Sequence, residues 1–157
     1  NNDISQLKLN LLRLERKMGG MGFMPPCSTY HRFAVGMTGD KMSSSKPETT
    51  IFMNDSIAQM KKKVKKAFSG GQPTVEEHRR LGGDCSKDVP FQYLQFFFEK
   101  DDNVLNDIKR DYESGKILAG EMKNICIENA TIWLNDLSEK RDEWADKVNE
   151  FLAPDAI

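Results

Sequence analysis

The stretch from Asp88 to Phe98, DVPFQYLQFFF, is strongly apolar and decides what kind of core the chain can form. Asp88 followed by Pro90 is typical of a helix start, because aspartate caps free amides and proline fits the first turn. A helix there is apolar on every side, which predicts burial in the core. The alternative is a platform for unpaired bases, which also stack on aromatic rings. The aromatic residues concerned are Phe91, Tyr93, Phe96, Phe97 and Phe98.

Helical patterns continue downstream of this segment. A helix is predicted from about Asn103 to Tyr112 and ends at Ser114-Gly115. An apolar stripe at near-heptad spacing then runs toward Pro154, which predicts one long helix or two helices broken near Asn135-Asp136. Its members are Cys126, Ala130, Trp133, Leu137, Trp144, Val148 and Phe151, with Arg141 standing among them.

Two capping patterns predict helices upstream. Ser56 with Gln59 forms a capping box, and the apolar stripe of the helix that it opens is Ile57, Met60, Val64 and Phe68. Thr74 with Glu77 forms a second box, and Gly82-Gly83 ends that short helix.

The first fifty residues divide into a helix and an irregular part. Apolar residues three to four apart predict an amphipathic helix from Ile4 to Met18, ended by Gly19-Gly20. From there to Pro47, glycines and prolines separate short apolar pieces such as Phe33-Ala34-Val35, which predicts loops and at most one short strand. The fold class expected from these patterns is mainly α.

Composition sets outer limits on the function. The 157 residues carry 23 basic and 24 acidic side chains, so any surface for RNA must be local. No apolar run is long enough to cross a bilayer, and no leader pattern opens the chain, so we expect a soluble protein with no membrane partner. Three cysteines without close pairing favour a reducing compartment over a disulfide framework.

A metal site is weighed because two cysteine–histidine pairs occur. Cys27 precedes His31 by four residues, and His78 precedes Cys85 by seven. Zinc sites need four ligands in close pairs, and the sequence does not supply them. We therefore expect no metal, and we interpret these residues as packing or hydrogen-bonding groups.

The segment Lys41-Met42-Ser43-Ser44-Ser45 has the chemistry of a phosphate-binding loop. A lysine supplies charge, serine hydroxyls supply donors that rotate to suit, and the preceding Gly39-Asp40 turn lets the loop move. An ordinary serine-rich surface turn is the alternative, since short motifs match by chance.

A lysine run on the predicted helix from Ser56 to Phe68 has two interpretations. Its lysines either form a solvated face or contact RNA phosphates, where each contact releases counterions. The run consists of Lys61, Lys62, Lys63, Lys65 and Lys66.

The ordered set of motifs resembles the carboxy-terminal half of the tryptophanyl-tRNA synthetases of archaea and eukaryotes. After the Lys41 loop come AFSGG from Ala67, TVEEHR from Thr74, GGDC from Gly82 and Asp88-Val89. The match continues through Tyr93-Leu94, Phe97-Phe98-Glu99, Asp101-Asp102, Tyr112, Ser114-Gly115 and Leu118 to Glu121, and covers roughly Pro26 to Leu152. The related tyrosyl enzymes share the lysine–serine loop but lack the run from Ser-Gly-Gly to Glu-Glu-His-Arg.

The resemblance implies two domains and a reaction. Residues 1–54 would be the end of a Rossmann-type catalytic domain, and residues 55–157 a helical anticodon-binding domain. Tryptophan would be activated by ATP with Mg²⁺ and passed to its tRNA. Lys41, Ser43 and Ser44 would be catalytic, holding the triphosphate together with Ser45 and stabilising the charge on pyrophosphate. Met42 would pack the loop, and Ser44 stands where many synthetases have a second lysine.

The resemblance also implies partners and an RNA surface. The segment that reads the anticodon would begin at Gln72-Pro73, where human-type relatives carry Arg-Asp. Base contacts would come from Gln72 and Thr74, and phosphate contacts from Lys62 and Lys66. Ser69, Gly70 and Gly71 would lie against the RNA, although the glycines also suit a helix stop. The expected protein is a cytoplasmic homodimer that binds tRNA(Trp).

Two departures leave other functions open. The family's His-x-Gly-His segment is absent, since the histidines are His31 and His78, and Asn2 to Ser5 replace an Asp-Gln-Asp-Pro stretch. We therefore expect this chain to begin partway through the catalytic domain and to be inactive alone. The alternatives are a non-catalytic tRNA-binding module or synthetase paralogue, and a helical interaction protein without an RNA role.

Overall fold

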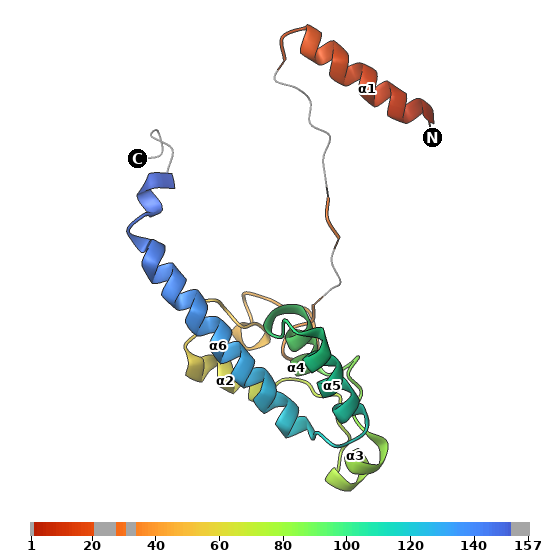
Figure 1. Cartoon of the computed structure of the whole chain (residues 1–157), viewed down its shortest axis with the longest axis vertical. Coiled ribbons are helices and arrows are strands. Elements are labelled where there is room, and N and C mark those ends of the chain that lie inside the picture. Colours follow the sequence, from red (N-terminus) through yellow and green to blue (C-terminus); the bar gives the residue numbers. More distant parts are fainter. Residues whose placement is uncertain (1, 21–27, 31–33, 152–157) are drawn as a thin grey trace. The chain divides into compact units, whose positions relative to one another are not determined.

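The computed structural model describes residues 2–20, 28–30 and 34–151. The chain divides into two compact units, residues 1–32 and residues 33–157 (Figure 1). Cys27 and His31 of the weighed metal pairs lie outside the described residues, as does Phe33 of the predicted strand. Ala34 and Val35, which are described, are not in a strand. The domain boundary near residue 54 stays a prediction, and residues 34–54 pack within the second unit.

The described part of the first unit holds one helix, α1, from Asn2 to Lys17. The structure confirms the helix predicted from the three-to-four spacing, with Asp3 in its first turn and Arg16 and Lys17 in its last. These charges oppose the partial charges of the helix ends. Gly19 follows with a positive φ of 80°. The apolar stripe of α1 is exposed, and its members are Ile4, Leu7, Leu11, Leu14 and Met18.

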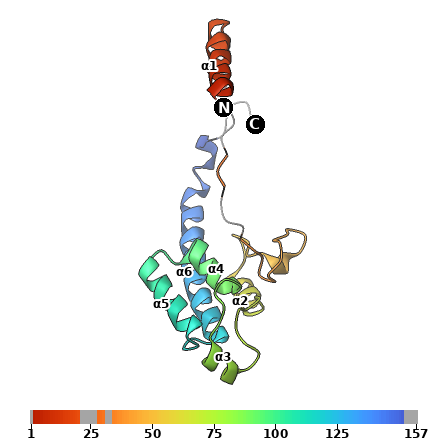
Figure 2. The same ribbon diagram turned by 90° about the vertical axis from the view of Figure 1, so that its right-hand side faces the viewer.

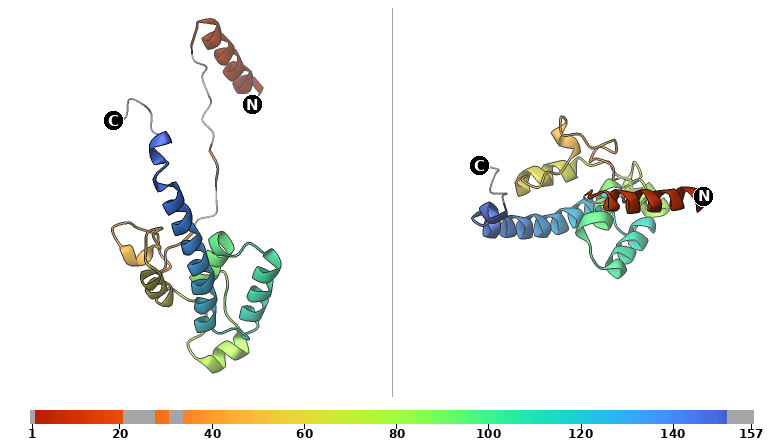
Figure 3. Two further views of the ribbon diagram at one scale, coloured as in Figure 1. Left: turned by 60° about the vertical axis from the view of Figure 1, so that its left-hand side comes forward. Right: turned by 90° about the horizontal axis from the view of Figure 1, so that it is seen from above.

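The second unit is a bundle built around the long helix α6, Ala119–Ala145. Helix α2 and the segment formed by α4 and η2 pack against it. Figures 1, 2 and 3 show α2 on one side of α6 and α5 on the other. The remaining elements are η1 (Pro47–Thr49), α2 (Ile57–Lys65), α3 (Val75–Leu81), α4 (Val89–Tyr93), η2 (Leu94–Phe98), α5 (Asp102–Glu113) and η3 (Val148–Phe151). None of the helices in the described ranges has both the length and the apolar character needed to cross a bilayer.

Helix α6 is continuous, which decides between the two predicted arrangements in favour of one helix. Its first half is buried, through Met122, Cys126, Ile127, Ala130 and Leu134. The predicted stripe stops being core toward its end, because Trp144 is 47% exposed and Phe151 72% exposed. The physical reason is length: α6 continues past the elements that cover its first half (Figure 1).

The aromatic segment is a short α-helix followed by a π-helical turn. Asp88 caps α4 by accepting a hydrogen bond from the amide of Phe91 at 2.9 Å, as predicted. Phe91 and Tyr93 are core residues, each 4% exposed, but Phe97 is 47% exposed. The prediction that all five aromatic residues are core is therefore wrong for Phe97, and Phe96 is only half-buried. The wider π turn leaves Phe97 off the face that α4 buries, whereas Phe98 packs against the core and lies 5.9 Å from the Trp133 ring.

Helix α2 has the predicted capping box at Ser56 and Gln59. It ends at Lys65, so Phe68 does not belong to its stripe and is half exposed. Phe68 leaves the helical path because its backbone is used elsewhere: its amide donates to the Met37 carbonyl at 2.7 Å, and its carbonyl accepts from Val89 at 3.2 Å. The residues after α2 thereby tie the segment around Met37 to the start of α4.

Two glycines end helices where the sequence places them. Gly82 follows α3 with φ of 75°, and Gly115 follows α5 with φ of 77°. A side chain at Gly82 would also collide with the backbone of Glu113. Thr74 caps the start of α3, since its hydroxyl accepts from the Glu77 amide at 3.1 Å. These turns fix the loop between α3 and α4 against the end of α5.

Lys63 differs from the other lysines of α2, because it is a structural residue. Its ammonium lies 2.5 Å from the Asp55 carboxylate and donates to the Thr50 carbonyl at 2.8 Å. The two charged side chains are only 13% and 8% exposed. Asp55 also accepts from the Phe52 amide at 2.9 Å, and the ammonium lies 4.6 Å from the centre of the Phe52 ring. This ion pair fixes residues 50–55 onto α2.

Replacing Lys63 by methionine should therefore destabilise the fold. We expect Lys63→Met to lower the free energy of unfolding by about 2 to 4 kcal/mol, because it leaves a buried carboxylate without its counter-charge. Urea unfolding followed by circular dichroism would measure it. Lys61→Met, the same change at an exposed position of the same helix, should stay within about 0.5 kcal/mol of wild type. Equal losses in the two variants would contradict the structural role of Lys63.

Candidate functional site

The lysine–serine loop, residues 41–45, is carried on a compact turn. At its base the Gly36 amide donates to the Asp40 carbonyl at 2.6 Å, and the Gly39 amide donates to the Gly36 carbonyl at 2.9 Å. Gly39 has φ of 88°, which a side chain would strain. The Met37 amide donates to the Thr49 carbonyl at 2.9 Å and joins the two ends of the loop. The loop is thus closed at its base by backbone bonds.

Thr49 holds the loop closed from inside. Its side chain is buried, and its hydroxyl oxygen accepts from the Ser43 amide at 3.0 Å. The hydroxyl proton has two carbonyls within reach, Lys46 at 2.8 Å and Ser43 at 3.3 Å. Sequence reasoning missed this residue, because a threonine at the end of the short Pro47–Thr49 turn has no distinguishing pattern.

The side chains of the loop separate into an outer and an inner set. Lys41, Ser44 and Ser45 are exposed, and the Ser43 hydroxyl lies 2.9 Å from that of Ser45. Met42 is half-buried, and its sulfur lies 3.5 Å from the Tyr93 hydroxyl. An ammonium and several hydroxyls are therefore presented to solvent on a closed loop. This chemistry suits a polyphosphate, whose oxygens need positive charge and donors.

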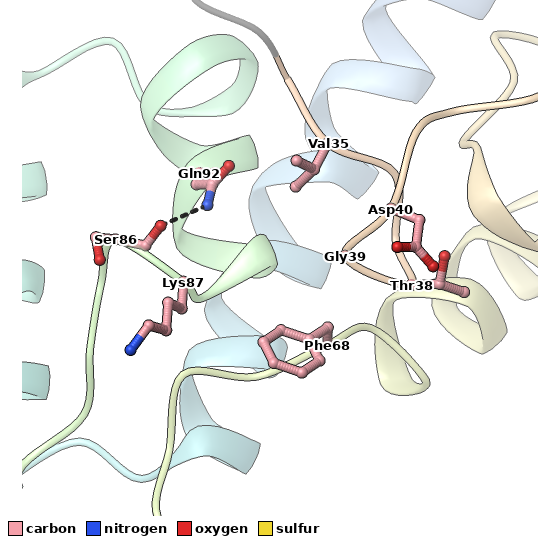
Figure 4. A pocket seen from close by; sticks show the side chains of 8 residues that line it. All are labelled: Val35, Thr38, Gly39, Asp40, Phe68, Ser86, Lys87 and Gln92. Atoms are coloured by element: carbon pink, nitrogen blue, oxygen red, sulfur yellow. Dashed lines mark hydrogen bonds between the residues drawn. The ribbon is translucent and has the colours of Figure 1, made fainter.

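A hollow of about 320 Å³ lies beside the base of the loop (Figure 4). It is lined by residues of both charges, Asp40 and Lys87, and by Phe68. The Gln92 amide lies at its wall and donates to the Ser86 carbonyl at 2.9 Å. None of residues 41–45 lines it, so it adjoins the loop and does not extend the phosphate-binding groups. The complete lining is Val35, Thr38, Gly39, Asp40, Phe68, Ser86, Lys87 and Gln92.

The second predicted site is the turn after α2, and it is fixed by a buried carboxylate. Asp88 is 0% exposed. Its Oδ2 accepts from the Gly70 amide at 2.9 Å, from the Tyr112 hydroxyl at 2.8 Å and from the Ser69 hydroxyl at 3.2 Å. Its Oδ1 accepts from Phe91. Four donors around one buried charge offset the cost of removing it from water.

His78 fixes the other end of this turn. It is 3% exposed, and its Nε2 lies 2.9 Å from the Ile117 carbonyl. Because a carbonyl can only accept, Nε2 carries the proton, and Nδ1 accepts from the Gln72 amide at 3.3 Å. The Gln72 side chain donates to the Gly82 carbonyl at 3.0 Å. Gln72, predicted to read a base, is therefore turned toward the protein in this structure.

The other residues predicted to meet RNA at this turn also have structural roles. The Ser69 hydroxyl is used by Asp88, and it accepts from the Gly71 amide at 3.1 Å. A side chain at Gly70 would collide with the carbonyl of Asp84, which explains the glycine without RNA. Thr74 is exposed, and its hydroxyl caps α3. Contact of these residues with RNA stays a prediction.

The lysines of α2 divide by exposure. Lys62 and Lys66, predicted to meet phosphates, are exposed, as are Lys61 and Lys65. Lys63 is the exception described above, so the basic surface has four members where the sequence shows five. From α6, the Lys123 ammonium donates to the Lys65 carbonyl at 3.0 Å, which fastens the end of α2. The exposed lysines thus stand on a helix that is held at its C-terminus.

The described residues were also compared with the needs of a cysteine nucleophile and of a metal site. Burial raises the pKa of Cys85 to about 12, with Glu113 and Asp88 adding to the effect. Burial also raises the pKa of Cys126 to about 12. Both thiols therefore stay protonated near neutral pH and are poor nucleophiles. Within residues 2–20, 28–30 and 34–151, no three His, Cys, Asp or Glu side chains gather as metal ligands.

Comparison with known proteins identifies the family. The model of the class I tRNA synthetases (W and Y) matches residues 8–136. The tryptophan–tRNA ligase of Saccharolobus solfataricus is 42% identical over 143 residues, which cover 88% of this chain and 38% of that protein. The human cytoplasmic tryptophan–tRNA ligase is 43% identical over 138 residues, 85% of this chain and 29% of that protein.

Solved structures agree with the sequence comparison. The crystal structure of tryptophanyl-tRNA synthetase from Aeropyrum pernix K1 matches with a TM-score of 0.81 and 32% identity, over 93% of this chain and 41% of that one. The enzyme from Giardia lamblia matches with a TM-score of 0.67 and 38% identity, over 83% of this chain and 32% of that one.

The chain belongs to the class I tRNA synthetase family that comprises the tryptophan and tyrosine enzymes. Within that family its relatives are tryptophanyl-tRNA synthetases of archaea and eukaryotes, which confirms the resemblance seen in the sequence. The chain spans about two fifths or less of the length of the relatives named here.

The Asp88 network yields a prediction about stability. Asp88→Asn should lower the free energy of unfolding by about 2 to 4 kcal/mol, because the amide that replaces one oxygen donates toward groups that are themselves donors. The matched control is Asp84→Asn, four residues earlier. The Asp84 side chain is 42% exposed, and its pKa is lowered chiefly by the Ser86 hydroxyl and then by Lys87. Asp84→Asn should lower the free energy of unfolding by less than about 1 kcal/mol. Thermal and urea unfolding of both variants would measure the two losses. If Asp88→Asn were as stable as the control, the hydrogen bonds of Asp88 would not have the stabilising role described here.

Proposed function

We propose that this chain supplies two working parts of a tryptophan–tRNA ligase: the loop that binds the triphosphate of ATP and the helical domain that binds tRNA. The observation that carries the proposal is the closed loop at residues 41–45, which presents Lys41 and Ser44 to solvent. In this proposal residues 1–54 end the Rossmann-type catalytic domain, and residues 55–157 form the anticodon-binding domain. The whole protein activates tryptophan with ATP and transfers it to tRNA(Trp).

The loop acts on the leaving group of the first reaction. The tryptophan carboxylate attacks the α-phosphate of ATP, and negative charge accumulates on the departing pyrophosphate. The ammonium of Lys41 and the hydroxyls of Ser43, Ser44 and Ser45 are donors that stabilise that charge. Mg²⁺ enters with ATP and neutralises further phosphate charge. Thr49 contributes by holding the Ser43 amide, at 3.0 Å, so that the loop keeps its closed form.

The helical domain contacts RNA through exposed charge and through the turn after α2. Lys62 and Lys66 meet backbone phosphates, which position the tRNA without reading its sequence. Gln72 and Thr74 are the base-reading candidates, and Gln72 must exchange its bond to Gly82 for a base edge. Ser69, Gly70 and Gly71 set the shape of the turn and bring its backbone close to the RNA. A cytoplasmic homodimer is the assembly that goes with this proposal.

A second candidate is a tRNA-binding paralogue without ligase activity. It is favoured by departures within this sequence, namely Asp3 to Ser5 in place of the family's Asp-Gln-Asp-Pro stretch and Pro73 where human-type relatives carry an acidic residue. The coding sequence upstream of Asn1 separates the two candidates, because an in-frame His-x-Gly-His segment supports the ligase. By itself the 157-residue chain should show no pyrophosphate exchange, since it lacks that segment.

The catalytic assignment predicts a large rate effect for Lys41. In the complete protein, Lys41→Ala should lower the rate of tryptophan-dependent pyrophosphate exchange by roughly two to three powers of ten, as expected when one donor to developing charge is removed. Affinity for tryptophan should hardly change. The control is Lys46→Ala, at an exposed lysine next to the loop, and it should lower the exchange rate much less. Exchange by Lys41→Ala within twofold of wild type would refute the assignment.

The RNA assignment predicts a change in salt dependence. Replacing Lys62 and Lys66 together by glutamine should reduce the slope of log Kd for tRNA(Trp) against log salt concentration by about one to two units. The control replaces Lys140 of α6 and Lys147 just after it, whose side chains are 65% and 45% exposed, and should leave the slope unchanged. Filter binding over a range of salt concentrations gives both slopes. If the Lys62 and Lys66 variant kept the wild-type slope, that face of α2 would be ordinary solvated surface.

A further inference from the structure

A buried tyrosine of the helical core reaches the middle of the lysine–serine loop. The Tyr93 hydroxyl lies 3.5 Å from the Met42 sulfur, although 51 residues separate the two in sequence. Tyr93 is 4% exposed, so its hydroxyl is removed from bulk water. A buried hydroxyl costs stability unless it is bonded, and here the thioether is its acceptor.

Tyr93 is held in place on its own side of the contact. It is the last residue of α4, whose first turn is fixed by Asp88 and Pro90. Its ring packs edge-on against Phe97, with centroids 5.5 Å apart, and lies 6.2 Å from the ring of Phe98. Burial raises the pKa of Tyr93 to about 12, so the hydroxyl keeps its proton and donates at neutral pH. The donor is thus both fixed and always protonated.

Met42 is the adaptable side of the contact. A methionine side chain has three rotatable bonds, and its sulfur is a weak acceptor. On one side of it is the glycine hinge at Gly39, with φ of 88°, and on the other is the Thr49 hydroxyl, which binds the Ser43 amide. Fixing Met42 therefore fixes the backbone of its direct neighbours, Lys41 and Ser43. The contact is weak enough to yield when the loop moves.

We propose that Tyr93 is a positioning residue for the lysine–serine loop: it holds Met42 and thereby orders Lys41 and Ser43 before the triphosphate arrives. The inference rests on the proposed function of the loop. Ordering a loop in advance lowers the entropy that binding must overcome. Tyr93 touches no substrate in this scheme, and its effect on ATP passes entirely through Met42.

A double-mutant cycle in the complete protein tests the proposal. Tyr93→Phe removes the donor, and Met42→Leu removes the acceptor while nearly keeping its volume. Each should raise the KM for ATP in pyrophosphate exchange by about two- to fivefold, the lower part of the range expected for one hydrogen bond because sulfur is a weak acceptor, with the KM for tryptophan unchanged. The double variant should be no worse than either single one, because both remove the same contact. Multiplied effects, or an unchanged KM for ATP in Tyr93→Phe, would overturn the proposal.

Ile108→Val is the control for a general loss of stability. It removes one methyl-sized group from the same core, on α5, where Ile108 is buried. It should lower the unfolding temperature about as much as Tyr93→Phe and leave the KM for ATP unchanged. A KM for ATP that rises equally in this variant would show that the Tyr93 effect is only structural, and would overturn the proposal.

Limited trypsin digestion gives a readout that does not depend on activity. Lys41 in the loop and Lys46 beside it are both exposed. Trypsin cleaves poorly before proline, and Pro47 follows Lys46, so cleavage in this segment reports on Lys41. Tyr93→Phe should accelerate cleavage after Lys41 severalfold, and Ile108→Val should not. If the wild-type protein shows no exchange, the proposed function fails, while the digestion still decides whether Tyr93 holds the loop. Equal cleavage rates in wild type and Tyr93→Phe would overturn the positioning role.

Discussion

The buried carboxylate of Asp88 is the constraint on which the rest of the helical unit depends. A charge that is 0% exposed is stable only if donors surround it, and these donors come from three separate parts of the chain. The amide of Phe91 belongs to α4, the Gly70 amide to the turn after α2, and the Tyr112 hydroxyl to α5. Satisfying one charge therefore sets the relative positions of two helices and a turn.

The same region connects the two candidate sites. Phe68, directly before the turn, donates to the Met37 carbonyl at 2.7 Å and accepts from Val89 at 3.2 Å. Met37 in turn donates to Thr49, which closes the lysine–serine loop. A short run of backbone bonds thus joins the base of the lysine–serine loop to the turn proposed to meet tRNA. Movement of either one strains groups that also hold the other, so the loop and the turn are parts of one packed structure.

The sequence predicted what depends on neighbours along the chain. The capping box at Ser56, the cap at Asp88 and the stop at Gly82 each involve residues three or four apart, and the structure confirms them. Contacts between distant residues could not be predicted in this way. The His78 bond to the Ile117 carbonyl, 39 residues away, and the Tyr93 contact with Met42, 51 residues away, depend on the tertiary fold. Thr49 binds Lys46 and Ser43, three and six positions away, but no helix or capping pattern marks it in the sequence. The apolar spacing also predicted a core that is too long toward the end of α6. Spacing along the chain cannot show where neighbouring helices stop covering that helix.

The lysine run shows how the fold turns an ambiguous pattern into a definite surface. Sequence gives five lysines in six positions, and a helix must point some of them inward. Lys63 lies one residue before the buried Val64, and its ammonium is neutralised by Asp55. The remaining lysines are exposed on a helix whose end is held by Lys123 from α6. Because the inward lysine is already paired, only the outward ones offer charge to phosphates. A rigid helix then presents that charge at fixed spacing, which suits a backbone of regularly spaced phosphates better than a flexible basic tail would.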